Sequence, residues 1–141
     1  MCAQPTKAAW KKIGEALEQA RVELSPRYRN RTLFAQERGI DYRLAYDVEM
    51  GARDNYRRPT RRAIEVAYGR PPNWIDERLA ADDPNRPRFP DDPLMERKSV
   101  AIWAARFDDE GQIMSDDAAR IVIGELAAMA ARETESRRQA G

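Results

Sequence analysis

Residues 25 to 62 read SPRYRNRTLFAQERGIDYRLAYDVEMGARDNYRRPTRR, a stretch that predicts two short helices joined by a tight turn. Asn30 is suited to cap a helix over residues 31 to 38, because its side chain can accept from the free amides of the first turn. Gly39 supplies the left-handed residue that ends such a helix, and Asp41 can cap a second helix over residues 42 to about 49. Ile40 completes the turn, so the two helices are expected to lie close together.

The second of these helices has two faces of different chemistry. At about 100° per residue, Ala45 and Val48 fall on an arc that suits a packed core. The side chains on the other arc are of types that could contact DNA. Arginine can donate hydrogen bonds to guanine, aspartate can accept from cytosine or orient the arginine, and tyrosine can contact phosphates or thymine methyl groups. The candidate base-reading residues are Tyr42, Arg43, Leu44, Tyr46 and Asp47, with Leu44 at the border of the two arcs. Taken alone, the segment also fits a solvated amphipathic helix.

The stretch resembles the lambda-repressor-like, or XRE, family of helix-turn-helix DNA-binding proteins. Phe34 and Ala35 match the paired Leu-Ala of that family's first short helix, and Gly39-Ile40-Asp41 matches its Gly-Val-Ser/Thr turn. The family's I-x-x-[IL]-E-x-G ending is matched by Ala45, Val48, Glu49 and Gly51. The resemblance covers about residues 8 to 79 and implies a five-helix, all-α DNA-binding domain over residues 1 to 81.

The resemblance also implies roles for particular side chains. Arg31, the first residue of the first short helix, is expected to grip a phosphate, while the exposed face of the second helix enters the major groove. Glu49 is expected to form a structural ion pair with Arg21. Two departures from the family pattern are that residues 25 to 29 form a longer connection and that Ala45 is smaller than the usual Ile.

The flanking sequence supplies three further helices. Residues 8 to 24 place apolar side chains at helical spacing, and Pro59 can begin a fourth helix, where its missing amide costs nothing. Pro71 and Pro72 open a fifth. The expected buried residues are Trp10, Ile13, Leu17, Ala20 and Leu24 in the first helix, Ala63, Ile64 and Ala67 in the fourth, and Trp74, Ile75 and Leu79 in the fifth.

Charge divides the chain into two unlike halves. Up to Pro72 there are 15 basic and 9 acidic residues, net +6, whereas from Asn73 there are 10 basic and 15 acidic residues, net −5. Such asymmetry is a hint of nucleic-acid contact. The candidate DNA-phosphate residues are Arg29, Arg31, Arg53, Asn55, Tyr56, Arg57 and Arg58. Arginine outnumbers lysine 21 to 4, as is typical of genomes with high GC content. The number of arginines is therefore weak evidence of DNA binding by itself.

Composition narrows the class of protein. The chain has 141 residues, one cysteine (Cys2) and no histidine, so an internal disulfide, a Cys/His zinc site and His-dependent catalysis are excluded. No run of about 18 apolar residues could span a bilayer, and no secretory signal is visible. We expect a cytoplasmic, nucleoid-associated protein with no cofactor or metal. The paired acids at 82–83 and 91–92 lie in linker-like sequence, so an enzyme is not expected.

The sequence after Ala81 is expected to form two parts. Pro84, Pro87, Pro90 and Pro93 recur every three residues, which predicts a Pro-rich linker over residues 82 to 93 in an extended polyproline II conformation. Residues 94 to 141 then predict a pair of helices, the second with Ala118, Ile121, Val122, Leu126 and Met129 on one stripe and a frayed tail from Arg132. The proposed dimerisation residues are Val100, Trp103, Phe107, Ile121, Val122 and Leu126.

Small helices need tertiary packing, so the C-terminal pair is expected to hold a homodimer together. The alternative is that the pair folds back on its own N-terminal domain. The resulting functional prediction is a sequence-specific, double-stranded DNA-binding transcription regulator, a bacterial or phage repressor. The alternative function is an antitoxin-like module, whose acidic C-terminal helices bind a basic protein partner and whose N-terminal domain regulates its own promoter.

Overall fold

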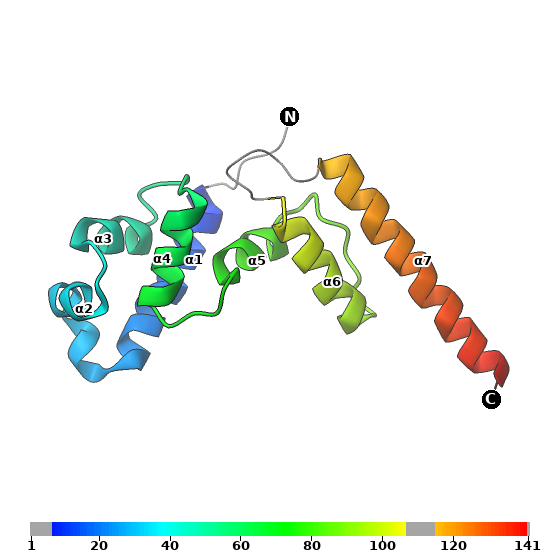
Figure 1. Cartoon of the computed structure of the whole chain (residues 1–141), viewed down its shortest axis with the longest axis horizontal. Helices are drawn as coiled ribbons and strands as arrows, with labels where there is room; N and C mark the ends of the chain where they lie inside the picture. Colours follow the sequence, from blue (N-terminus) through cyan, green and yellow to red (C-terminus); the bar gives the residue numbers. More distant parts are fainter. Residues whose placement is uncertain (1–6, 107–114, 141) are drawn as a thin grey trace.

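The computed structural model describes residues 7–106 and 115–140, and within these ranges it contains helices and no strands. The fold is therefore all-α there, as the sequence predicted. The elements in chain order are α1 (Lys7–Leu24), the 3-10 helix η1 (Pro26–Arg29), α2 (Arg31–Arg38), α3 (Tyr42–Met50), α4 (Arg58–Ala67), α5 (Trp74–Ala81), α6 (Pro93–Ala104) and α7 (Asp116–Ala140). Figure 1 shows α1 to α4 gathered at one end, α5 and α6 in the middle, and α7 extending away.

Among the described helices, none combines the length and the apolar composition needed to cross a membrane.

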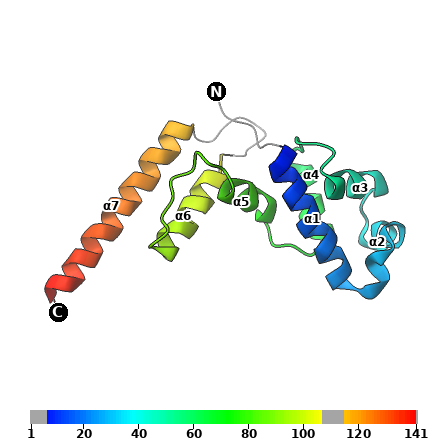
Figure 2. The same cartoon turned by 180° about the vertical axis from the view of Figure 1, so that it is seen from behind.

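A first core joins α1 to α5. Leu17 of α1, Phe34 of α2, Val48 of α3, Ile64 of α4 and Ile75 of α5 are all buried in it. The Phe34 ring lies 4.6 Å from the Tyr68 ring, measured between centroids. Seen from behind, α1 passes in front of α4, with α3 and α2 to one side, and its apolar residues belong to the first core (Figure 2).

The predicted capping residues shape the two short helices. The Asn30 side chain accepts a hydrogen bond from the Leu33 amide at 3.2 Å, and the Asp41 side chain accepts one from the Arg43 amide at 2.7 Å. Gly39 ends α2 with φ of 68°, a backbone conformation that glycine adopts without strain. These local interactions fix the lengths of both helices and therefore the direction in which α3 leaves the turn.

Gly14 lets α1 approach α3 closely. A Cβ atom at this position would collide with the backbone of Val48 and Glu49, so a larger residue would separate the two helices. The close contact seats the end of α3 against α1. Two expected core residues differ from prediction: Leu24 is exposed at the end of α1 and Ala63 is exposed on α4, because the α4 face that packs inward also includes Arg61 and Glu65.

A second core joins α5, α6 and α7. Ala80 of α5 is buried with Met95 and Trp103 of α6 and with Ala119 and Ile123 of α7. Because α5 contributes Ile75 and Leu79 to the first core and Ala80 to the second, it belongs to both. The second core therefore begins within α5, before the predicted boundary after Ala81. The helical pair folds back on α5, the alternative that the sequence left open.

The proline-rich segment between α5 and α6 is not an extended rod, and that prediction is wrong. Its chain bends at two turns, where the Arg86 amide donates to Asp83 and the Asp92 amide donates to Phe89, each at 3.2 Å. The Arg86 side chain is buried and donates to the Ala80 carbonyl, the Ser99 hydroxyl and both Glu96 carboxylate oxygens. These bonds fasten the segment against α6, which periodic proline spacing could not reveal.

Hydrogen bonding from Arg86 lowers the pKa of Glu96 from 4.5 to about 2. A carboxyl group whose pKa is depressed by folding stabilises the native state above its unfolded pKa, and this stabilisation is lost as pH falls from 4.5 towards 2. We therefore expect Glu96→Gln to lower the melting temperature at neutral pH and to converge with wild type near pH 2. Thermal unfolding of both proteins across this acid range checks the prediction. A difference that persists undiminished to the acid end would contradict it.

The packing of α7 differs from the predicted stripe. Ala119 and Ile123 are buried, and Leu126 packs partly against the second core, while Ile121 and Met129 are exposed. Helix α7 is apolar over much of its circumference, so the position of α6 decides which side is covered. The predicted frayed tail is also helical through Ala140, with Glu133 and Arg137 paired one turn apart at 3.4 Å. Such pairs stabilise an exposed helix by a few tenths of a kcal/mol.

Candidate nucleic-acid interface

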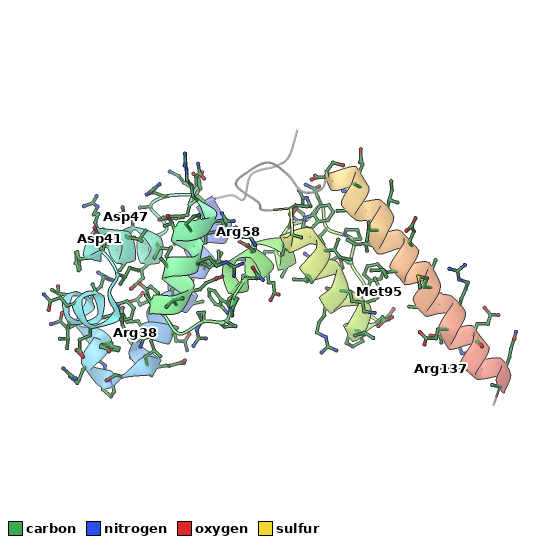
Figure 3. All side chains as sticks on the ribbon, viewed as in Figure 1. Arg38, Asp41, Asp47, Arg58, Met95 and Arg137 are labelled. Atoms are coloured by element: carbon green, nitrogen blue, oxygen red, sulfur yellow. The ribbon has the colours of Figure 1, made fainter. Side chains whose placement is uncertain are left out.

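The face of α3 that points away from the first core holds most of the predicted base-reading residues. Tyr42 is 45% exposed and Tyr46 is 38% exposed, and Arg43 is also exposed. Asp47 is partly buried beside them. Figure 3 places Asp41 and Asp47 at the end of the molecule opposite Arg137 of α7, so this face is remote from the second core. Leu44 differs from the prediction, because its partly buried side chain packs against the first core.

The exposed side chains of α3 contact one another. Arg43 Nε lies 3.3 Å from Asp47 Oδ1, one helical turn along. The Tyr42 and Tyr46 rings stack with their centroids 6.4 Å apart, and the guanidinium groups of Arg31 and Arg43 lie 5.3 and 5.8 Å from the Tyr46 centroid. A cation over an aromatic ring is attracted by the ring quadrupole. The exposed charged and aromatic groups of α3 are therefore in mutual contact.

Glu49, on the buried side of α3, is the centre of a polar cluster. The expected pair with Arg21 is present as a fork, with Arg21 Nη2 2.9 Å from Oε1 and Arg21 Nε 3.0 Å from Oε2. The Tyr68 hydroxyl donates to Oε2 at 2.6 Å. Burial, followed by this hydrogen bond, raises the pKa of the Tyr68 phenol. Arg21 also donates to the Tyr28 carbonyl, so the cluster ties α1, η1 and α3 together.

Arg31 occupies a different place from the one expected of a phosphate ligand. Its Nε and Nη2 atoms donate to Glu49 Oε1 at 3.3 Å, and its side chain is 17% exposed. It therefore links the buried carboxylate to the Tyr46 ring above it. The family resemblance did not indicate this contact, because it assigned Arg21 as the partner of Glu49.

Tyr56 is wrongly predicted as a phosphate contact. It is 3% exposed and packs in the first core, with its ring centroid 4.9 Å from that of Trp10. Its hydroxyl finds no hydrogen-bond partner in the described part of the chain, and burial raises the pKa of this phenol. The Arg53 guanidinium covers the ring at 4.8 Å from its centroid. A tyrosine among arginines looked solvated in sequence, whereas the apolar ring fills space beside Trp10.

The remaining predicted phosphate residues are exposed around α3. Arg53 and Asn55 lie in the loop after α3, where Arg53 Nη2 donates to the Asn55 carbonyl at 3.2 Å. Arg57 and Arg58 are exposed at the start of α4, and Arg29 is exposed at the end of η1. Figure 3 labels Arg58 on α4. These side chains form a basic rim, defined here as Arg29, Arg53, Arg57 and Arg58.

The sequence missed one exposed residue of this face. Met50, the last residue of α3, is 45% exposed and lies one turn after Tyr46. The signal was available, because a methionine at this spacing falls on the same arc as Tyr42, Arg43, Tyr46 and Asp47.

The proposed dimerisation residues lie in different environments. Trp103 is fully buried in the second core, where its Nε1 donates to Asp83 Oδ2 at 2.8 Å, so it cannot form part of an intermolecular surface. Val100 and Leu126 pack partly against the same core, and Val122 is partly buried. Ile121 is exposed, whereas Phe107 lies outside the described residues.

Comparisons of this chain with protein-family models, with curated proteins and with solved structures gave no match.

Proposed function

We propose that the chain is a sequence-specific, double-stranded DNA-binding transcription regulator, with repression as its expected mode. In this proposal α2 and α3 form a helix-turn-helix of the lambda-repressor-like kind, and α3 lies in the major groove. The observation that supports it best is the two-sided α3. Its inner side is packed through Ala45, Val48 and Glu49, while its outer side exposes an arginine and two tyrosines in fixed contact.

The basic rim supports DNA over a protein or small-molecule ligand. An α-helix fits the major groove of B-DNA, which is about 12 Å wide, and basic side chains beside it reach the phosphates that border the groove. Arg29 directly precedes α2, Arg53 follows α3, and Arg57 and Arg58 lie at the start of α4. The basic rim therefore lies on both sides of the α2–α3 segment in the sequence. Its charge agrees with the net +6 of residues 1 to 72.

Replacing one arginine of the rim should weaken binding to specific and random duplexes alike. A phosphate contact releases counterions, so Arg57→Gln should reduce the slope of log K against log salt concentration by about one unit. Fluorescence anisotropy titrations across salt concentrations measure the slope. Arg137→Gln is the matched control, because Arg137 is exposed at the far end of α7 and should leave the slope unchanged. Equal slopes for wild type and Arg57→Gln would contradict the assignment.

We also propose a homodimer, on a surface revised from the sequence prediction. Two copies that read half-sites one helical turn apart would gain affinity through effective concentration. Since Trp103 is internal, we place the interface on Ile121 and Met129, which are two of the exposed large apolar side chains of α6 and α7. Both are more than half exposed, and α7 projects beyond α6 (Figure 1).

The antitoxin-like alternative gains no support from the end of α7. That alternative requires an acidic surface for a basic partner. Residues 131–140 are exposed, and their charged side chains are Arg132, Glu133, Glu135, Arg137 and Arg138, a net positive set. DNA-binding regulation is therefore the function that the described surfaces support best.

A further inference from the structure

We infer that the outer face of α3 selects a guanine next to a pyrimidine that bears a C5 methyl group. This inference rests on the proposed function and deepens it, because it names the bases recognised. Arg43, Tyr42 and Tyr46 supply the base contacts, and Asp47 positions Arg43.

The Arg43–Asp47 pair leaves one edge of the guanidinium available. Asp47 Oδ1 holds the Nε side of Arg43 at 3.3 Å, and the Arg43 side chain is 79% exposed while that of Asp47 is 16% exposed. Arginine presents its donors as a rigid fork, and the contact with Asp47 is made at Nε, so the two Nη atoms remain available as a pair of donors. Guanine offers two acceptors, O6 and N7, at the spacing of this fork in the major groove. We therefore assign Asp47 as a positioning residue for Arg43.

The tyrosine pair provides an exposed aromatic surface beside that fork. The Tyr42 and Tyr46 rings are inclined to each other by 28°, and the guanidinium groups of Arg31 and Arg43 both lie over the Tyr46 ring. Apolar side chains contact the C5 methyl group that thymine projects into the major groove. A 5-methylcytosine presents the same group. The surface therefore suits a methylated pyrimidine over cytosine.

Helix geometry sets the distance between the two contacts. Arg43 and Tyr46 are three residues apart, which is about 4.5 Å along the helix axis. One base-pair step in B-DNA is about 3.4 Å. The guanine and the methyl group should consequently occupy adjacent base pairs, or pairs with one base pair between them when the helix is inclined in the groove.

Base analogues test each contact separately. A binding site is first isolated by selecting bound duplexes from a random pool with the full chain. Single guanines are then replaced by 7-deazaguanine, which lacks the N7 acceptor, and single thymines by uracil, which lacks the methyl group. We expect one guanine position at which 7-deazaguanine weakens wild-type binding about tenfold and affects Arg43→Ala little. At a neighbouring thymine, uracil should weaken wild type about threefold and affect Tyr46→Ala little, and 5-methylcytosine should bind better than cytosine.

Asp47→Asn separates positioning from folding. It should keep the wild-type melting temperature and the affinity for random DNA, yet lose several-fold of the preference for guanine. A selected site whose affinity is unchanged by every 7-deazaguanine and uracil substitution would overturn the inference while leaving DNA binding intact. Failure to bind any duplex would instead overturn the proposed function and, with it, this inference.

Discussion

Arg21→Met should lower the free energy of unfolding by about 3 to 5 kcal/mol, because it leaves the buried Glu49 carboxylate without its principal cation. The Arg21 and Glu49 side chains are 4% and 0% exposed, so solvent cannot replace the lost fork. Arg31 and Tyr68 still contact Glu49, which places the expected loss towards the lower end of this range. Urea unfolding followed by circular dichroism measures the change.

Arg27→Met is the matched control for this prediction. Arg27 pairs with Glu37 at 3.1 Å, but the two side chains are 67% and 34% exposed. Exposed pairs contribute less than about 1 kcal/mol, so this variant should unfold close to wild type. If Arg21→Met and Arg27→Met lowered the free energy of unfolding by the same small amount, the prediction would be contradicted. The polar cluster around Glu49 would then not stabilise the packing of α3 against α1.

Trp103→Ala should lower the free energy of unfolding by about 3 to 5 kcal/mol, because it removes the largest buried side chain of the second core and leaves a cavity. It also removes the hydrogen bond to Asp83 and the ring beneath the Arg106 guanidinium, which lies 3.9 Å from the ring centroid. Because the contacts are within one chain, the loss should be the same at every protein concentration. Unfolding curves recorded over a hundredfold range of concentration check this.

Ile121→Ala provides the comparison on the opposite side of α7. An exposed side chain away from a packed core usually changes stability by less than about 0.5 kcal/mol, so the unfolding of a single copy should be unaffected. Sedimentation of this variant reports whether Ile121 helps two copies associate. A Trp103→Ala protein that unfolds like wild type but sediments as a smaller species would show that Trp103 lies between copies, contrary to its burial in the second core.

Sequence reasoning predicted the elements around α3 well, because the signals there are local. The Asn30 and Asp41 side chains cap helices within one turn of their own positions. Gly39 ends α2 with a positive φ, which is also a local requirement. The ion pair of Arg21 and Glu49 came from a family resemblance, since no local rule joins residues 28 positions apart. Long-range pairing of this kind depends on how α1 crosses α3.

Elsewhere the errors share one cause, which is that burial depends on partners distant in sequence. Tyr56 lies in a loop rich in arginine, and only the position of Trp10 makes it a core residue. On α7, an apolar stripe could include either Ile121 or Ile123. Packing in the second core buries Ile123, while Ile121 remains exposed. The proline repeat predicted an extended rod, but Arg86 provides enough buried hydrogen bonds to fold the segment against α6.

The same reasoning explains why the candidate site was predicted only in part. Exposed residues on one arc of α3 follow from helix periodicity, so Arg43 and Tyr46 were found. The contact between Arg43 and Asp47 was one of two alternatives in the sequence, and the structure contains the ion pair. The position of Arg31 between Glu49 and Tyr46 required three elements to be placed together, which periodicity does not provide.

The central claim is that α3 reads the sequence of double-stranded DNA. Selection of bound duplexes from a random pool, with wild type and Arg43→Ala compared in parallel, tests it most directly. Wild type should enrich one motif containing a guanine, and Arg43→Ala should enrich the same motif with no preference at that base pair. If wild type enriches no motif above the starting pool, or if Arg43→Ala enriches the same motif with its guanine intact, then α3 is not the reading element.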